Sequence, residues 1–365
     1  MVTVIERGDV LAPGPAGPAS VLVVGGRVVQ VGAVDRAAVD RVFPDAGVID
    51  AAGCYVCPGL IDPHAHLIGA GGEQGFASRQ PELTWQQLAL AGVTSVVGCL
   101  GTDAVTRTLP GLIGKARELA ARGLSVYCYT GSFQVPPPTL TGSVHRDIVL
   151  IPEVIGVGEV AVADVRSSQP TVAELARIVA DAYVAGTLAG KAGVTHFHVG
   201  PSDRRLADLH ALLDGFDIVP RCLYPTHVTR TRALMDDAIA LARRGAFVDT
   251  DTVEPGTAKW LKYYLEHGGP PERLTFSSDA QTPGGSPHRL FAELVAAVRE
   301  HEVPLARALP HFTANAAAAL GLARKGRLEA GADADLLVVD RRTLEVRDVM
   351  AGGRLLVRNG SPVDS

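Results

Sequence analysis

The sequence predicts an α/β protein, a (β/α)8 TIM barrel with a small β-sandwich domain formed by both chain termini. Three observations carry this prediction. Short apolar strands alternate with helical patterns through the middle of the chain, which is typical of repeated βα units around a parallel sheet. Eight such alternations fill a region about as long as the ~250 residues that a barrel of this kind takes. Both ends of the chain carry β-hairpin patterns instead.

The small domain is expected to comprise residues 1–57 and 325–365. The first piece alternates Val/Ile-rich runs with turns such as the one at 25–26, and the second repeats this style around 352–353. Neither piece is large enough to fold alone. We therefore expect the two termini to pair into one domain.

The barrel is expected to occupy residues 58–324. Its strands are predicted at residues 55–62, 94–99, 124–130, 158–164, 195–199, 223–227, 246–251 and 274–279. Helical patterns lie between them, for example at residues 171–189, 233–244 and 290–300. An open doubly wound sheet is the alternative, but no GxGxxG motif follows the first strand, and histidines rather than glycines lie at the strand ends.

Composition narrows the class of protein. The chain has 365 residues with 47% hydrophobic content, enough for a large core, and a formal net charge of -5. The sequence has no block rich in lysine and arginine that could bind along a row of phosphate groups. Neither nucleic acid nor an anionic membrane is therefore an expected partner. The N-terminal segment lacks a secretory signal pattern, and no run of 18 apolar residues predicts a membrane span. The cysteines are sparse and odd in number, which fits reduced thiols and a cytoplasmic location.

The stretch PGLIDPHAH, residues 58–66, ends the first barrel strand with His64 and His66. Side chains two apart on a strand point the same way, so both imidazoles can enter one small volume. Such a pair alone fits a polar core as well as a metal site. The other ligands must come from elsewhere in the chain.

Polar residues also occur on or at the ends of other predicted strands. In a barrel of this kind the chemistry lies at the carboxyl ends of the strands, where we expect four imidazoles and two carboxylates to converge. These candidate metal ligands are His64, His66, Glu159, His198, His227 and Asp279. This mixture of ligands suits Zn2+, with Mn2+, Co2+ or Ni2+ as alternatives.

The candidate ligands divide naturally between two ions. His64, His66 and Asp279 would hold one ion. His198 and His227 would hold the other, and a carboxylate of the fourth strand would bridge the two. Two ions about 3.5 to 4 Å apart can share a water, lower its pKa toward about 7 and polarise a carbonyl. Asp279 would then accept the proton of that water and later deliver it to a leaving nitrogen.

These residues resemble the amidohydrolase superfamily, and more closely its isoaspartyl (β-aspartyl) dipeptidases. The resemblance runs over essentially the whole chain. It is carried by PGLIDPHAHLIGAGGEQG, by GVTSVVGCLGTD at 92–103, by TGSV at 141–144, by GVTHFHVG at 193–200, by PTHVTR at 225–230 and by SSD at 277–279. The His-x-His pair marks only the superfamily, whereas GGE, LGTD and PTHVxR together indicate the narrower group.

The resemblance implies an enzyme that cleaves the amide bond of a β-aspartyl dipeptide or close analogue with a metal-activated hydroxide. It implies two divalent metal ions, with Zn2+ as the first choice, a small dipeptide-like substrate and a homo-oligomer. It also implies that Glu73 takes the free α-ammonium group of the substrate and that Gly71 and Thr102 lie beside the carboxylate of the aspartyl moiety. Arg166 and Arg230 would bind substrate carboxylates, a task that suits the planar guanidinium fork. A structural ion pair is the alternative reading of these two arginines.

Glu159 marks one departure from the family pattern. The family usually bridges its metals with a carboxylated lysine of the fourth strand, but none of the lysines of this chain lies on that strand. A glutamate carries the same charge and the same pair of oxygens without needing CO2. We predict that Glu159 is the bridge.

Phe133 marks the second departure. At this substrate-binding position the family typically has a tyrosine that hydrogen-bonds the scissile carbonyl, and phenylalanine cannot donate. Losing such a donor can cost roughly 2.7 to 4 kcal/mol of transition-state stabilisation. Three explanations are open: the metal carries that load alone, another group such as the nearby Tyr129 replaces it, or the substrate differs. Residues 280–283 also depart from the family pattern, which leaves the leaving-group pocket open.

Two alternative functions follow from these departures. The barrel also supports other amidohydrolase reactions, such as hydrolysis of N-acyl amino acids, lactones or cyclic amides. A noncatalytic scaffold homologue is the alternative outside enzymes. The presence of all six candidate ligands argues against it, and Phe133 argues for it.

Overall fold

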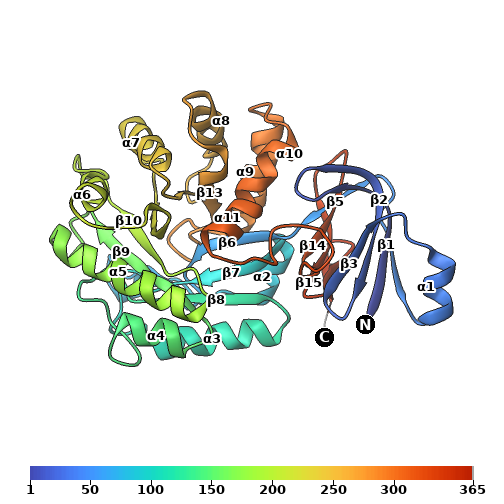
Figure 1. Cartoon of the computed structure of the whole chain (residues 1–365), viewed down its shortest axis with the longest axis horizontal. Helices are drawn as coiled ribbons and strands as arrows, with labels where there is room; N and C mark the ends of the chain where they lie inside the picture. Colours follow the sequence, from blue (N-terminus) through green and yellow to red (C-terminus); the bar gives the residue numbers. More distant parts are fainter. Residues whose placement is uncertain (364–365) are drawn as a thin grey trace.

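The structure is a computed structural model that describes residues 1–363. A parallel barrel and a mixed sheet built from both chain ends lie side by side (Figure 1), which confirms the predicted fold class. The barrel strands are ringed by helices on the outside, and the first and last described strands of the chain lie in the mixed sheet.

The mixed terminal sheet joins strands from the two ends of the chain. Its strands are β1 (Val2–Leu11), β2 (Pro15–Val24), β3 (Arg27–Gly32), β4 (Gly47–Asp50), β5 (Cys54–Pro58), β14 (Leu336–Asp340), β15 (Val346–Ala351), β16 (Arg354–Arg358) and β17 (Ser361–Pro362). They follow the order β17-β16-β15-β14-β5-β1-β2-β3, with β4 paired to β1. β5 connects the two ends because it pairs in parallel with β1 and antiparallel with β14. Aliphatic side chains from both ends share one buried core.

The barrel strands are almost entirely buried, and most of their residues are apolar. They are β6 (Leu60–Ala65), β7 (Val93–Gly98), β8 (Ser125–Thr130), β9 (Val154–Val162), β10 (Val194–Val199), β11 (Leu223–Thr226), β12 (Val248–Asp251) and β13 (Leu274–Ser277). Strands β6 to β11 pair in parallel in chain order, and β12 pairs with β13. Backbone hydrogen bonds extend this ring: Phe247 N–H donates to Leu223 O over 3.2 Å, and Asp279 N–H donates to His64 O over 3.0 Å. The continuous apolar runs are those of strands covered on both faces.

Helices cover the outside of the barrel, and α1 belongs to the terminal region. The α-helices are α1 (Arg36–Val42), α2 (Trp85–Leu90), α3 (Leu109–Ala121), α4 (Val144–Leu150), α5 (Val172–Ala189), α6 (Ala207–Gly215), α7 (Arg232–Arg243), α8 (Ala258–Glu266), α9 (Pro287–Arg299), α10 (Leu305–Ala308) and α11 (Ala314–Ala319). Short 3-10 turns lie at η1 (Phe76–Ser78), η2 (Pro220–Cys222), η3 (Pro271–Arg273) and η4 (Leu309–Phe312). The longest helix, α5, begins at a Thr171/Glu174 capping box and ends at Gly190 in the left-handed conformation. Within residues 1–363, no helix has the length and apolar character needed to cross a bilayer.

The first barrel strand predicted from the sequence is in fact two strands, which Gly59 separates. The Gly59 N–H donates to Asp335 O over 3.0 Å, and a Cβ atom at this position would lie 2.3 Å from Thr94 Oγ1. Only glycine allows this close approach. The chain crosses here from the terminal sheet into the barrel, and β6 then carries His64 and His66 to the barrel mouth.

Candidate active site

The carboxyl ends of the barrel strands surround a cavity of about 510 Å³. Eleven of the twelve residues predicted for the site line this cavity: His66, Gly71, Glu73, Thr102, Phe133, Glu159, Arg166, His198, His227, Arg230 and Asp279. The twelfth, His64, lies fully buried and in contact with the same group. The barrel therefore brings all of the predicted positions together, although their roles stay predictions.

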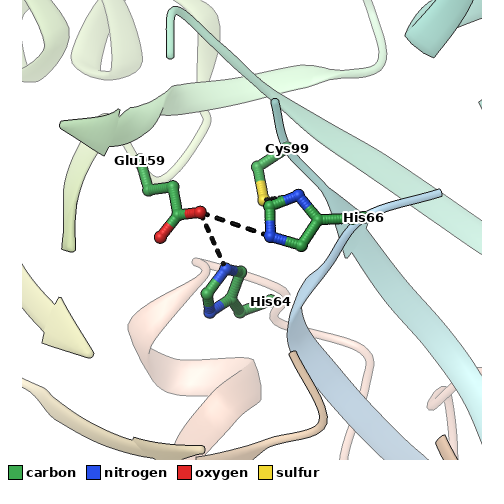
Figure 2. Close-up of side chains that lie close together, drawn as sticks. All are labelled: His64, His66, Cys99 and Glu159. Carbon is green, nitrogen blue, oxygen red and sulfur yellow. Dashed lines mark hydrogen bonds and ion pairs between the residues drawn. The ribbon is translucent and has the colours of Figure 1, made fainter. Parts of the chain in front are cut away.

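His64 and His66 form a first cluster with two carboxylates, one of which, Glu159, is drawn in Figure 2. The Nε2 atom of His66 lies 3.3 Å from Glu159 Oε1 and 3.1 Å from Asp279 Oδ1. The Nε2 atom of His64 lies 3.4 Å and 3.5 Å from the same two oxygens. Two imidazole nitrogens and two carboxylate oxygens thus face one point, as the ligands of a tetrahedral metal site do.

His198 and His227 form a second cluster on the other side of Glu159. His198 Nδ1 lies 3.3 Å from Glu159 Oε2, and His227 Nε2 lies 3.8 Å from the same oxygen. The two oxygens of this carboxylate therefore face different clusters. Glu159 itself lies within β9, three residues before the strand ends at Val162, and its side chain still reaches the mouth.

The nitrogen and oxygen atoms of the first cluster are suitable ligands for a bound cation. Both ring nitrogens of His64 and the Oδ1 atom of Asp279 are buried and have no hydrogen-bond partner among the described residues. Leaving such a group unpaired costs about 1–3 kcal/mol, more when it is charged. Burial alone would lower the pKa of the His64 imidazole, yet the charge of Glu159 raises it well above its usual value. This environment stabilises positive charge, as a metal site does.

Glu159 is held in its charged form. Burial by itself opposes ionisation of a carboxyl group, but the imidazoles around it, His64 foremost, lower the pKa of Glu159 well below its usual value. A charged carboxylate with one oxygen toward each cluster has the geometry needed to bridge two cations.

Cys99 lies beside the first cluster, and the sequence analysis gave it no role. Its Sγ atom is 3.7 Å from His66 Nδ1, the ring nitrogen that faces away from Glu159 (Figure 2). The thiol also lies close enough to His64, His66 and Glu159 for the four residues together to be a group that could hold a metal ion. Its position at the end of the second predicted barrel strand was the available signal.

Asp164 and Asp251 each hold one histidine of the second cluster from behind. Asp164 Oδ2 lies 3.0 Å from His198 Nε2, and Asp251 Oδ2 lies 2.9 Å from His227 Nδ1. Each carboxylate fixes which ring nitrogen faces Glu159, the usual arrangement around metal-binding histidines. Both aspartates end predicted strands, so the criterion that selected the ligands could also have selected them.

Asp62 lies beneath the first cluster and ties two strands together. Its carboxylate accepts hydrogen bonds from the Ser278 N–H, over 3.0 Å, and from the Ser278 hydroxyl, and a longer one from the His64 N–H at 3.4 Å. Burial raises the pKa of Asp62 to about 6. This carboxylate therefore connects the backbone that carries His64 with the backbone that carries Asp279.

The predicted substrate residues form a charged rim. Thr102 Oγ1 donates to Glu73 Oε1 over 3.0 Å, and Arg166 Nη1 lies 3.7 Å from the same oxygen. Arg230 Nε donates to Val199 O over 2.9 Å. The rim thus presents one carboxylate and two guanidinium groups to the cavity, which suits a zwitterion with additional carboxylates.

Phe133 packs inside the cavity against the second cluster. Its ring centroid lies 4.3 Å from that of His198 and 5.2 Å from Arg166 Cζ. Tyr129 does not replace the missing hydroxyl, because its own hydroxyl is buried and donates to Pro63 O over 3.2 Å. Of the three explanations left open by the sequence, this geometry removes the Tyr129 alternative.

Comparison with known proteins agrees with this site. A model of the amidohydrolase family matches residues 55–356, which include every candidate site residue. The chain therefore belongs to the amidohydrolase family, whose members are metal-dependent enzymes, and its buried histidine, glutamate and cysteine side chains could bind metal.

Two solved structures place it within that family. The β-aspartyl dipeptidase of Fervidobacterium islandicum AW-1 is 40% identical with a TM-score of 0.95, over 100% of this chain and 99% of that one. The same enzyme in complex with the β-Asp-Leu dipeptide is 38% identical with a TM-score of 0.94 over the same shares. The chain is thus a member of the β-aspartyl (isoaspartyl) dipeptidase family, a group of hydrolases acting on amide bonds.

Curated relatives share less with the chain. Adenine deaminase of Geobacillus kaustophilus is 27% identical over 86% of this chain and 52% of its own length. Imidazolonepropionase of Anaeromyxobacter dehalogenans is 36% identical over 34% of this chain and 32% of its own length. The chain therefore spans about a third to a half of these relatives. Because these relatives are named for different reactions, they do not indicate the substrate of this chain.

Proposed function

We propose that this protein hydrolyses the amide bond of β-aspartyl dipeptides or close analogues with the help of two divalent metal ions. The observation that carries the proposal is the joint placement of both histidine clusters and the charged rim in one cavity. The full-length similarity to a β-aspartyl dipeptidase supports the substrate class.

We propose Zn2+ for both ions, because imidazole and carboxylate ligands suit it. His64, His66 and Asp279 would hold one ion and His198 and His227 the other. Glu159 would bridge them in place of a carboxylated lysine, which its two divergent oxygens support. When bound, such ions lower the pKa of water and polarise a carbonyl.

The side chains of the cavity supply the remaining chemistry. Asp279 accepts the proton of the attacking water and delivers it to the leaving nitrogen, because it is the carboxylate of the first cluster that does not have to bridge. Glu73 pairs with the α-ammonium group of the substrate, beside Gly71 and Thr102. Arg166 and Arg230 pair with the substrate carboxylates.

A hydrolysis screen tests the proposed substrate. It would cover β-aspartyl, α-aspartyl and γ-glutamyl dipeptides, N-acyl amino acids, lactones and cyclic amides. We expect β-Asp-Leu and related β-aspartyl dipeptides to be cleaved fastest. Preference for another class would overturn the substrate assignment, and no cleavage of any compound by metal-loaded protein would favour a noncatalytic scaffold.

Metal analysis tests the proposed bridge separately. Protein purified without chelator should contain close to two ions per chain. The Glu159→Ala variant should lose at least one of them, and unchanged occupancy would mean that Glu159 is not the bridge. Asp214→Ala, at an exposed surface carboxylate paired with Arg244, is the matched control and should retain both ions.

Phe133 favours a second candidate function. Because it offers no hydroxyl to the scissile carbonyl, another amidohydrolase reaction on an N-acyl amino acid, lactone or cyclic amide is the alternative. The same screen distinguishes these reactions. A homo-oligomeric assembly and a cytoplasmic location complete the proposal; they come from the family resemblance and the cysteine content, respectively.

A further inference from the structure

Asp164 lies between a candidate metal ligand and a candidate substrate-binding residue. Its Oδ2 atom is 3.0 Å from His198 Nε2 and 2.7 Å from Arg166 Nη2, and its Oδ1 atom accepts from Arg166 Nε over 3.0 Å. The carboxylate is 2% exposed. Arg166 Nη2 also lies 2.9 Å from His198 Nε2, so the guanidinium and the imidazole meet each other at this buried carboxylate, which contacts both.

The hydrogen bonds of Arg166 to Asp164 use Nε and Nη2, so Nη1 is the guanidinium nitrogen that can bind a ligand. Asp164 takes the edge formed by Nε and Nη2, whereas Nη1 points to the rim, 3.7 Å from Glu73 Oε1. Phe133 packs against both His198 and Arg166 and so supports their relative positions. The arginine is 38% exposed, in keeping with contact to a ligand in the cavity.

We propose that Asp164 is a positioning residue that couples carboxylate binding at Arg166 to cation binding at His198. This inference deepens the proposed function and rests on it, because it takes Arg166 as the substrate contact and His198 as the metal ligand. A ligand carboxylate that orders Arg166 also orders Asp164, and Asp164 in turn holds the His198 ring with Nδ1 toward Glu159.

The coupling is reciprocal by thermodynamic linkage. If substrate binding strengthens cation binding in the second cluster by some factor, the cation strengthens substrate binding by the same factor. Typical couplings of this kind are about 5- to 150-fold. The first ligand to bind orders the side chains of the network. The second ligand therefore loses less free energy to ordering when it binds.

Arg230 provides the matched control. It lies in the same cavity and is the other candidate for a substrate carboxylate, but its Nε donates to the Val199 carbonyl rather than to a carboxylate that holds a histidine. Removing Arg230 should weaken substrate binding without removing the coupling. Removing Arg166 should do both.

The experiment measures the Zn2+ dissociation constant of the second equivalent with and without an inert ligand. The ligand is a β-Asp-Leu analogue in which a –CH2–CH2– link replaces the scissile CO–NH group, so that neither a carbonyl oxygen nor an amine nitrogen at this point can reach the ions. In the wild-type protein we expect the ligand to tighten Zn2+ binding at least about 5-fold. In Asp164→Asn we expect Zn2+ binding about 10- to 100-fold weaker and a ligand effect below about 2-fold.

Variants of the exposed arginines test the coupling without disturbing the buried carboxylate. Arg166→Ala should reduce the ligand effect on Zn2+ binding below 2-fold, whereas Arg230→Ala should retain it once the ligand is saturating. In the Arg166→Ala background, Asp164→Asn should no longer change the KM for β-Asp-Leu. Circular dichroism checks that each variant is folded.

The outcomes separate this inference from the proposed function. If the wild-type protein cleaves β-Asp-Leu but Asp164→Asn keeps the wild-type ligand effect on Zn2+ binding, the coupling is wrong and the function stands. Equal behaviour of the Arg166→Ala and Arg230→Ala variants also overturns it. If the wild-type protein cleaves no β-aspartyl dipeptide, the proposed function fails, and the Zn2+ affinity of Asp164→Asn still shows whether Asp164 holds His198.

Discussion

His227 Nδ1 lies 2.9 Å from Asp251 Oδ2, and this contact turns the Nε2 atom of the ring toward Glu159. Burial alone would raise the pKa of Asp251, but the neighbouring His227 lowers it to about 2, so the aspartate is charged at neutral pH. Burial alone would lower the pKa of His227. The charge of Asp251 and its hydrogen bond to the ring outweigh burial and raise the pKa of His227 to about 9. A charged acceptor behind an imidazole increases the basicity of the nitrogen in front.

The Asp251→Asn variant should therefore bind its second metal ion about 10- to 100-fold more weakly. The amide keeps the size of the side chain but removes the charge that holds His227. Metal titration followed by calorimetry measures the change. The exposed Asp214→Asn variant is the control and should bind both ions as the wild type does. Wild-type affinity in Asp251→Asn would mean that the contact does not orient the ligand.

Removing the metal ions should lower the thermal stability of the protein. His64 and Asp279 bury polar atoms that have no partner among the described residues, and carboxylates and imidazoles crowd around them. Ions present at 100 times their dissociation constant stabilise the folded state by about 2.7 kcal/mol per site. Scanning calorimetry with and without chelator should show a lower Tm without ions, restored by Zn2+. Equal Tm values in both samples would contradict metal binding in the folded state.

The convergence of the candidate metal ligands could be predicted from the sequence because of the geometry of a parallel barrel. Strands of one direction end at one rim, so His66, His198 and Asp279 had to lie close together once their strands were recognised. The prediction needed only strand direction and strand ends. It did not need side-chain conformations, which the sequence does not determine locally.

Asp164 and Asp251 end predicted strands and could have been selected as site residues, but their position behind the imidazoles depends on side-chain conformation. A carboxylate behind an imidazole acts through the ring nitrogen that faces away from the ion, and which nitrogen that is depends on the rotamers of both side chains. The break at Gly59 was missed because an apolar run of this length reads as one strand. Only the packing of Gly59 against Thr94 shows that the run crosses between two sheets.

Restoring a hydroxyl group at residue 133 should increase the rate on β-aspartyl dipeptides. The Phe133 ring lines the cavity and packs against His198, and Tyr129 is too deeply buried to act in its place. One added donor to the developing oxyanion is worth about 100- to 1,000-fold in kcat. Steady-state kinetics of Phe133→Tyr on β-Asp-Leu measures it, with Phe216→Tyr at an exposed position as the control. A flat or lower rate would favour a different substrate.

His311 should make stability depend on pH between about 4 and 6.5. Its ring is buried, and its Nδ1 lies 3.0 Å from Leu274 O, the carbonyl that accepts its hydrogen bond. Burial, with a smaller effect of Arg307, lowers the pKa of His311 from 6.5 to about 4. Between these values the unfolded chain binds a proton that the folded chain does not, so the free energy of unfolding falls as the pH falls. Above about pH 6.5 the contribution is complete, and it is lost by about pH 4.

The size of this contribution can be measured against a variant that does not titrate. At about 1.36 kcal/mol for each pH unit, the interval corresponds to about 3 kcal/mol. Urea unfolding of His311→Asn, whose amide can donate to the same carbonyl, should lose about 3 kcal/mol less than the wild type between pH 7 and pH 4. His288→Asn, at an exposed histidine, should follow the wild-type curve. Parallel curves for His311→Asn and the wild type would show that the imidazole is protonated as readily in the folded protein as in the unfolded chain.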